Sequence, residues 1–156
     1  MNDEIYILDT SAILSGFVIN SNKLMISAKV FEEIKKGKAK RNLDMNIENI
    51  EIVEPDPKYV KMVKDAAKIT NDFLNLSETD IEVLAAAIQY NAIIITNDYA
   101  IQNVAKFMNI NFQNFGMNQI KKLVIWKYKC TGCSRYFDKY YKECPICGSP
   151  IKRVRR

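Results

Sequence analysis

The four cysteines of the chain lie within its last 27 residues, and they constrain the fold more than any other feature. Cys130 and Cys133 form one Cys-x-x-Cys pair, and Cys144 and Cys147 form a second pair after ten further residues. Two such pairs bring four thiolates to the corners of a tetrahedron, the coordination that Zn²⁺ adopts in structural sites. We therefore predict one structural zinc ion. Because four sulfur ligands leave no open position, this ion is expected to fold the tail and take no part in catalysis.

Disulfides are the alternative use of these cysteines. Residues 1–4 lack the basic start of a signal peptide, and no apolar run approaches the roughly 18 residues that a membrane span requires. We expect a cytoplasmic protein without membrane association, in which thiols stay reduced and clustered cysteines bind metal.

Histidine is absent from the chain. This excludes Ser-His-Asp triads, Cys-His pairs and histidine acid–base chemistry. With the cysteines assigned to zinc, catalysis is left to carboxylates, lysine, tyrosine or a metal held by carboxylates. A length of 156 residues fits one ordinary domain or one small domain with an added metal-held module.

The charge of the chain is unevenly distributed. Residues 118–156 hold eleven Lys/Arg and two Asp/Glu, a formal charge of +9, whereas the remainder holds 12 and 16, a charge of −4. Zinc bound by four thiolates lowers the tail by two, to about +7. A basic tail on an acidic body indicates nucleic-acid binding by the tail. The alternative is a solvated surface that serves solubility.

Short strands alternate with helices along the first two thirds of the chain. Apolar segments at 4–8, 24–26, 50–53, 92–96 and 110–112 predict strands, and the spacing at 28–36, 58–73 and 98–108 predicts helices. A further helix is expected after Ser77–Asp80, which resembles a capping box. Residues 121–129 are expected to form a strand that leads into the cysteine module. The alternation predicts an α/β fold, with a parallel sheet flanked by helices.

Four acidic residues occupy positions where such a fold places its ligand sites. Asp9 follows the first strand and Asp98 follows the most apolar one, and ligands bind outside the carboxyl ends of parallel strands. Asp80 lies in the first turn of its helix and Glu33 lies near the end of another. Carboxylates brought together require a compensating cation, and Mg²⁺ or Mn²⁺ held by oxygen ligands can activate water for attack at phosphorus.

Each of these acids also has an ordinary structural explanation. Asp9, Asp80 and Asp98 are suited to capping helices, and Glu33 beside Glu32 is suited to a solvated helix face. Either member of the Glu32-Glu33 pair could be the acid that faces the site.

The four acidic motifs resemble those of PIN-domain ribonucleases, in their order and in their placement at strand ends. The segments that carry the resemblance are 7–12, 30–34, 76–85 and 95–98. Residues 98–105, together with the paired Cys-x-x-Cys module, are similar to the Nin-one-binding endoribonucleases, which cut the precursor of small-subunit ribosomal RNA to form its mature 3′ end. The resemblance covers nearly the whole chain, and its most specific part is the order of a PIN domain and a zinc ribbon.

The resemblance implies a PIN-like nuclease domain over residues 1–117 and a zinc ribbon with a basic end over residues 118–156. It implies metal-binding, catalytic acids at Asp9, Glu33, Asp80 and Asp98, with Mg²⁺ or Mn²⁺ as the cofactor. Glu33 is chosen over Glu32 because it immediately precedes Ile34, as in the family pattern. Ser11 and Asn97 are expected to orient the acids or a metal-bound water. The implied partners are precursor small-subunit rRNA, the precursor of the small ribosomal subunit and other assembly factors.

Basic residues in two regions are candidates for RNA binding: Lys35, Lys36, Lys38, Lys40 and Arg41 just after Glu33, and Arg135, Lys152 and Arg153 in the tail. A solvated loop is the alternative for the first group. Exposed tail aromatics could stack on unpaired bases, or they could form the small core of the zinc module.

Two other functions remain open from the sequence. The first is a toxin-type PIN ribonuclease, against which the zinc tail argues, because such proteins resemble the first domain alone. The second is a non-catalytic RNA- or ribosome-binding factor whose acids serve as helix caps.

Overall fold

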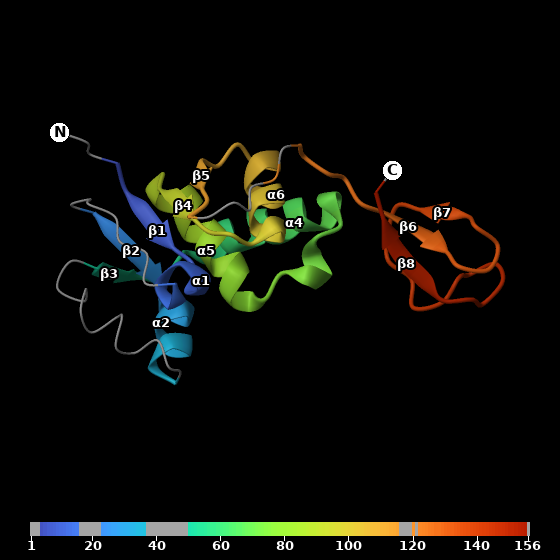
Figure 1. Ribbon diagram of the computed structural model, residues 1–156, viewed down its shortest axis with the longest axis horizontal. Coiled ribbons are helices and arrows are strands. Elements are labelled where there is room, and N and C mark those ends of the chain that lie inside the picture. The colour runs from blue at the N-terminus through green and yellow to red at the C-terminus, as the bar shows by residue number, and fades with distance from the viewer. Residues whose placement is uncertain (1–3, 16–22, 37–49, 116–119, 121, 156) are drawn as a thin grey trace.

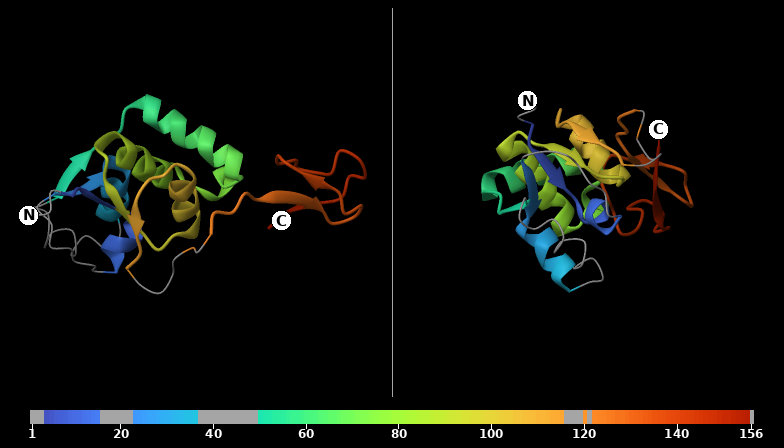
Figure 2. Two further views of the ribbon diagram at one scale, coloured as in Figure 1. Left: turned by 90° about the horizontal axis from the view of Figure 1, so that it is seen from above. Right: turned by 60° about the vertical axis from the view of Figure 1, so that its left-hand side comes forward.

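A computed structural model of the chain describes residues 4–15, 23–36, 50–115, 120 and 122–155. These residues form two parts that lie side by side in an elongated molecule (Figure 1). The larger part, the body, holds a five-stranded sheet with its helices. The smaller part, the C-terminal module, is a three-stranded sheet that stands apart at one end, as the views in Figure 2 also show.

The sheet of the body is parallel throughout and has the order β3-β2-β1-β4-β5. Its strands are β1 (Tyr6–Leu8), β2 (Leu24–Ser27), β3 (Ile50–Val53), β4 (Ile93–Ile95) and β5 (Phe112–Gln113). The strands β1, β2 and β4 are almost entirely buried, as expected of strands covered on both faces. The chain order changes direction between β1 and β4, so the topological switch point of the sheet lies between these two strands.

The helices of the body follow the strands as the alternation predicts. They are α1 (Thr10–Leu14), α2 (Ala28–Lys35), α4 (Pro57–Thr70), α5 (Glu78–Tyr90) and α6 (Tyr99–Phe107), with a short 3₁₀ helix, η2 (Phe73–Asn75). Residues 79 and 81–87 of α5 are all buried, because this helix packs on β1, β2 and β4 with one side and on α4 with the other. In α4 the buried residues recur at helical spacing, so one face of α4 is exposed.

Two predicted boundaries differ from the structure for identifiable reasons. The helix expected over 58–73 ends at Thr70, because Asn71 adopts a left-handed conformation with φ of 63° and ends the helix. The strand expected over 121–129 is confirmed in its second half alone, as β6 (Lys127–Cys130). Residues 122–126 run along the body instead, where Val124 and Trp126 hydrogen-bond to it.

In the C-terminal module, β6 pairs antiparallel with β7 (Tyr136–Phe137) on one side and with β8 (Ile151–Val154) on the other. Its buried apolar residues, within the described part of the chain, are Tyr128, Cys130 and Cys144. Such a module has too little core to fold by burial alone. Among the described helices, none is both long and apolar enough to cross a membrane.

Candidate active site and metal centre

The acidic site lies at the switch point of the sheet, where β1 and β4 end. Leu8 pairs with Ile95 in the ladder, and the backbone N–H of Asp9 donates to the carbonyl of Ile95 at 3.2 Å. Asp9 caps the N-terminus of α1, and Asp98 caps the N-terminus of α6. Two adjacent parallel strands therefore end in a carboxylate followed by a helix, so both acids point away from the same edge.

Asp9 is held by three hydrogen bonds. Its Oδ1 accepts from the backbone N–H of Ala12 at 2.9 Å and from the Ser11 hydroxyl at 2.7 Å, and its Oδ2 accepts from the Thr96 hydroxyl. Thr96 also accepts from the backbone N–H of Asp98 at 3.0 Å. The Thr96 side chain thus links the two aspartates. We did not predict this role of Thr96. Because Thr96 directly follows β4, its hydroxyl can reach the end of the neighbouring strand β1.

Glu33 reaches the same place from α2. The Thr10 hydroxyl donates to its Oε2 at 2.9 Å, and the Thr79 hydroxyl donates to its Oε1 at 2.6 Å. These two threonines, from α1 and α5, fix the carboxylate and were not foreseen either. Glu32 is not among the residues that line the pocket, so the structure places Glu33 as the inward member of the pair.

Asp80 forms a full capping box with Ser77. The Ser77 backbone N–H donates to Asp80 Oδ2 at 2.9 Å, and the Asp80 backbone N–H donates to the Ser77 hydroxyl at 3.1 Å. Asp98 caps α6 through Oδ1 alone, which accepts from the backbone N–H of Ala100 at 2.8 Å and of Ile101 at 3.0 Å. Both aspartates cap with one oxygen, so capping leaves each a second oxygen with which it can bind a ligand.

All four predicted acids line one pocket of about 380 Å³. Its lining residues are Asp9, Thr10, Ser11, Leu14, Glu33, Asp80, Asn97 and Asp98. Within the described residues, no lysine or arginine lines it. In the described part of the chain, the pocket therefore gathers negative charge without a basic side chain to compensate it.

The protonation of two of the acids reflects this crowding. Burial raises the pKa of Asp9, and the charge of Asp98 adds to the rise against hydrogen bonds that oppose it. Burial likewise raises the pKa of Asp80, with further contributions from Asp98 and Asp9. A divalent cation would relieve both effects, and a set of carboxylate oxygens suits hard ions such as Mg²⁺ and Mn²⁺. The donor set therefore fits the predicted metal.

The two residues predicted to orient the acids behave differently. Ser11 contacts Asp9 directly. Asn97 lines the pocket, but its side-chain oxygen accepts from the backbone N–H of Phe115 at 3.0 Å, so this oxygen holds the segment after β5. Orientation of a metal-bound water by Asn97 remains a prediction.

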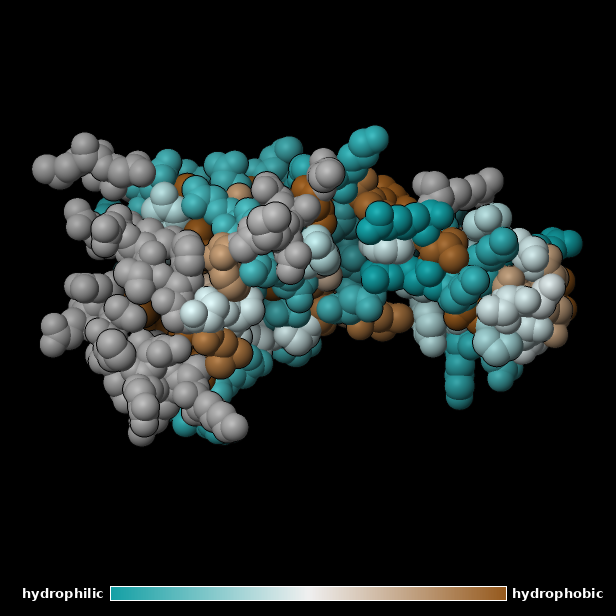
Figure 3. All heavy atoms as spheres, in the orientation of Figure 1, coloured by the Kyte–Doolittle hydropathy of each residue, from teal (hydrophilic) through white to brown (hydrophobic). Residues whose placement is uncertain are grey.

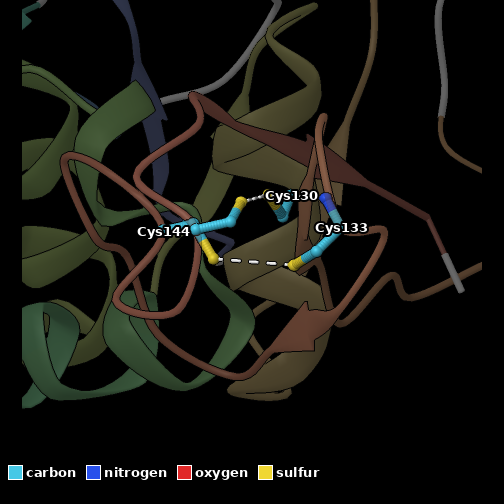
Figure 4. A group of neighbouring side chains, drawn as sticks. Cys130, Cys133 and Cys144 are labelled. Atoms are coloured by element: carbon cyan, nitrogen blue, oxygen red, sulfur yellow. Dashed lines mark hydrogen bonds between the residues drawn. The ribbon is translucent and has the colours of Figure 1, made fainter.

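The four cysteines are much more tightly gathered than the acids. Their sulfur atoms all lie within 4.8 Å of one another, and within the described residues no carboxylates form a group of this kind. The Sγ atoms of Cys133 and Cys144 are 3.7 Å apart (Figure 4). Those of Cys130 and Cys147 are 3.3 Å apart. Ligands about 2.3 Å from a tetrahedral zinc lie about 3.8 Å from one another, so the cluster is suited to one zinc ion.

Hydrogen bonds within the module favour the ionised form of Cys144 and Cys147, the form that zinc requires, whereas burial and the neighbouring thiols raise the pKa of Cys133 against a hydrogen bond to Arg135 that lowers it. The N–H groups of Gly132 and Cys133 point at Cys130 Sγ from 3.3 and 3.4 Å. Hydrogen bonds from Ser149 lower the pKa of the Cys147 thiol to about 6. Position 132 has no room for a side chain, because an added Cβ would lie 2.3 Å from the Ser149 hydroxyl oxygen and 3.2 Å from Cys147 Sγ.

The predicted RNA-binding residues are dispersed. Lys35 and Lys36 lie at the end of α2, while Lys38, Lys40 and Arg41 lie outside the described residues. Arg135 and Lys152 are exposed on the C-terminal module. The Arg153 guanidinium turns toward the body, where it forms an ion pair with Asp72 at 3.1 Å.

Comparison with known proteins agrees with this geometry. Residues 6–90 match the family model described as the PIN domain of ribonuclease. The chain belongs to the PIN-domain ribonuclease family. It is 45% identical to Ribonuclease VapC1 of Thermoplasma acidophilum and 38% identical to Endoribonuclease Nob1 of Methanocaldococcus jannaschii, in each case over 96% of this chain and 77% of the relative.

A second Endoribonuclease Nob1, from Methanothermobacter thermautotrophicus, is 35% identical over 96% of this chain and 92% of its own. A solved structure of VapBC2 from Rickettsia felis, bound to promoter DNA, covers 72% of this chain and 99% of its own with a TM-score of 0.50 at 22% identity. That likeness concerns the fold alone. The PIN domain and the endoribonuclease relatives together make this chain an endoribonuclease, with a C-terminal cysteine cluster consistent with a zinc ribbon.

Proposed function

We propose that this PIN endoribonuclease is metal-dependent and cleaves single-stranded precursor small-subunit rRNA at its mature 3′ end. The observation that carries the metal dependence is the pocket in which Asp9, Glu33, Asp80 and Asp98 meet without a compensating basic residue in the described chain. The proposed substrate is supported by the similarity to Endoribonuclease Nob1 proteins over 96% of the chain, a span that includes the cysteines.

The residues of the pocket have two different roles in the proposed reaction. Mg²⁺ or Mn²⁺ bound by the four acids would activate water and stabilise the charge that develops at phosphorus. Thr96 holds Asp9 beside Asp98, and Thr10 with Thr79 holds Glu33 toward them. Because the pKa values of Asp9 and Asp80 are raised, protons compete with the metal at a higher pH than they would for ordinary carboxylates, so metal affinity falls as the pH is lowered.

The toxin-type ribonuclease remains a second candidate because of one specific observation. The match to Ribonuclease VapC1 runs over 150 residues and 96% of this chain, so it extends into the C-terminal module. The module therefore does not separate the two candidates, contrary to our argument from the sequence. The two candidate functions differ in the RNA that the protein would cut.

Cleavage of defined RNAs tests the proposal. The full-length protein would be incubated with precursor RNA that spans the mature 3′ end, and with unrelated transfer and messenger RNAs, with and without Mn²⁺. We expect one Mn²⁺-dependent cut at the mature end. In Asp98→Asn, cleavage should fall by at least about 100-fold, since a metal ligand is lost without a change of volume.

The matched control is Asp65→Asn, which removes one exposed carboxylate of α4 that pairs with Lys61, outside the pocket. Its cleavage rate should equal that of the wild type. Cutting of unrelated RNAs in preference to the precursor would favour the toxin-type function. Normal cutting by Asp98→Asn would show that the acids are helix caps alone.

A further inference from the structure

The junction between the body and the C-terminal module is fixed by hydrogen bonds. The Asn103 side chain donates to the carbonyl of Val124 and accepts from its N–H, both at 2.7 Å. The N–H of Trp126 donates to the carbonyl of Thr70 at 3.0 Å, and the Asn71 side chain donates to the carbonyl of Trp126. The segment before β6 is therefore bound to α6 and to the end of α4.

A buried ion pair lies at the centre of the junction. Asp72 is 1% exposed and accepts hydrogen bonds from Thr70, from Asn103 and from Arg153 of β8. The Arg153 side chain is 27% exposed, and its loss would leave the charge of the buried Asp72 uncompensated. The pair therefore holds β8 in a defined position against the body.

A small pocket opens at this junction. It is lined by Asp72, Tyr99, Ala100, Asn103, Ile120, Val124, Trp126, Arg153 and Arg155. One wall is the first turn of α6, in which Tyr99 directly follows Asp98 of the acidic pocket. The other wall is formed by Trp126, by Arg153 of β8 and by Arg155, which directly follows β8. In Figure 3, hydrophilic side chains gather where the body meets the module.

The pocket combines exposed aromatic and cationic groups. Tyr99 is 54% exposed. The guanidinium groups of Arg153 and Arg155 lie 4.0 and 5.3 Å from the centre of the Trp126 ring. Arg153 is neutralised by Asp72, whereas Arg155 forms no ion pair with any described residue. A ring and an uncompensated cation are the groups that bind the base and the phosphate of unpaired nucleic acid.

The size of the pocket restricts what it can bind. Its volume is about 60 Å³, well below the roughly 300–1,000 Å³ of sites that enclose a small molecule. Such a space fits one flat group that enters it in part while the rest of the molecule stays outside. A base of a continuing strand meets this description, whereas an enclosed metabolite does not.

We propose that this pocket binds one unpaired nucleotide of the RNA strand beside the bond that is cut, with its base against Tyr99 and its phosphate on Arg155. The inference rests on the proposed ribonuclease function, because it assigns a binding position to the strand that the acids cleave. It gives the C-terminal module a direct part in the active site: the module completes a pocket whose other wall continues into the catalytic acids.

The single tryptophan of the chain lines the pocket and reports its occupancy. Full-length protein would be titrated with a labelled single-stranded oligoadenylate RNA in buffer without added Mg²⁺ or Mn²⁺, so that the probe stays intact. Trp126 fluorescence and RNA anisotropy should change over the same concentration range. Tyr99→Leu should weaken binding by about 5- to 150-fold, the usual effect of losing one base stack. Arg155→Ala should reduce the salt slope by about 0.7.

Two variants serve as matched controls. Lys142→Ala removes one exposed charge from the same module, at a residue that does not line the pocket and is not among the predicted RNA-binding residues. Tyr140→Leu removes an equally exposed tyrosine, 53% exposed, that does not line the pocket. Both should bind the probe more tightly than the corresponding pocket variants and keep the fluorescence change.

The proposal is overturned if RNA binds without a change in Trp126 fluorescence, or if the pocket variants bind like their controls. A fluorescence change with an acidic peptide but not with RNA would also overturn it and assign the pocket to a protein. Failure of the proposed ribonuclease function would look different. In that case the protein would still bind RNA in the pocket but would show no Mn²⁺-dependent cleavage.

Discussion

The acidic pocket lies on the edge of a domain whose core is complete without it, whereas the four thiols lie in a module that has almost no core. The body buries apolar residues from β1, β2, β3 and β4 and from all of its long helices, with Phe112 of β5 partly buried against them, and the acids are added at the ends of these elements. In the module, two of the three buried apolar residues are themselves cysteines of the cluster. In the body the fold positions the acids; in the module we expect a metal held by the thiols to position the fold.

The difference also appears in the spacing of the ligands. The thiols all lie within 4.8 Å of one another, close enough for one ion to bind all four, while the carboxylates are held by helix caps and threonine hydroxyls around an open pocket. A closed set of ligands suits structure, and an open set leaves room for substrate and water. The following predictions test this contrast, in order of expected effect.

Replacing one cysteine should unfold the module and leave the body folded. Cys144→Ser removes a buried ligand, and structural zinc contributes about 10–16 kcal/mol of binding free energy to such modules. We expect no bound zinc by elemental analysis and loss of hydrogen-exchange protection in β6–β8, with protection in α5 retained. Ile146→Ala, at an exposed position between the second pair of cysteines, is the control and should retain zinc. If the module stayed ordered without zinc, its fold would not depend on a metal, and the contrast between the module and the body would be wrong.

The two sites also differ in how far the sequence predicts them. The cluster of four cysteines was predicted in full because its members are close in sequence and one spacing rule describes them. Asp9 and Asp98 were predicted because strand ends are recognisable and parallel strands share an edge. The threonines that hold the acids were missed, since Thr79 reaches Glu33 across 46 residues and Thr96 reaches Asp9 across 87.

The junction was beyond sequence reasoning for the same reason. Asp72 and Arg153 are 81 residues apart, and each is an ordinary charged residue in its own segment. The apolar residues of 122–126 resemble a strand, but their backbone groups bond to Asn103 and Thr70 of the body. Pairings of this kind depend on tertiary contacts that local patterns do not encode.

A smaller change within the zinc module should weaken the metal without removing a ligand. In Gly132→Ala, the added methyl group would overlap the Ser149 side chain and press on Cys147 Sγ. We expect zinc affinity to fall by about 10- to 100-fold, the usual effect of disturbing groups behind the ligands. Competition with a coloured chelator measures this directly.

The control for this change is Gly148→Asn, because Gly148 has φ of +77° with open space around it, and asparagine tolerates that conformation. It should bind zinc nearly as well as the wild type. Equal losses in both variants would show that the module tolerates no substitution near the metal, and would leave the specific role of Gly132 unsupported.

In the body, loss of a supporting hydroxyl should reduce catalysis and leave the fold intact. Thr79→Val keeps the shape of the side chain but removes the hydrogen bond to Glu33. We expect cleavage to fall by about 10-fold, with the melting temperature nearly unchanged. Thr79→Ser restores the hydroxyl and should restore most of the rate. If Thr79→Val lowered stability but not the rate, Glu33 would belong to the packing of α2 and not to the metal site.

The smallest effect is expected in the stability of the acidic site itself. Burial and the charge of Asp98 raise the pKa of Asp9 in the folded protein above its value in the unfolded chain. The folded state therefore loses stability as the pH rises from the unfolded pKa to the folded pKa. At higher pH the stability stays at this reduced level. Asp9→Asn keeps acceptor and donor atoms for the Ala12, Ser11 and Thr96 contacts but has no charge. Without divalent metal at pH 7, it should unfold with a free energy roughly 0.5–1 kcal/mol higher than the wild type.

Thermal unfolding as a function of pH measures this difference, which should shrink as the pH falls toward about 4, near the unfolded pKa of aspartate. The Lys61 side chain lowers the pKa of Asp65, so Asp65→Asn should change stability in the opposite direction above that pKa. Added Mn²⁺ should stabilise the wild type more than Asp9→Asn, because it binds the folded acids. If Asp9→Asn were instead the less stable protein, the Asp9 carboxylate would be needed by the fold as the thiolates are, and the two sites would no longer differ in kind.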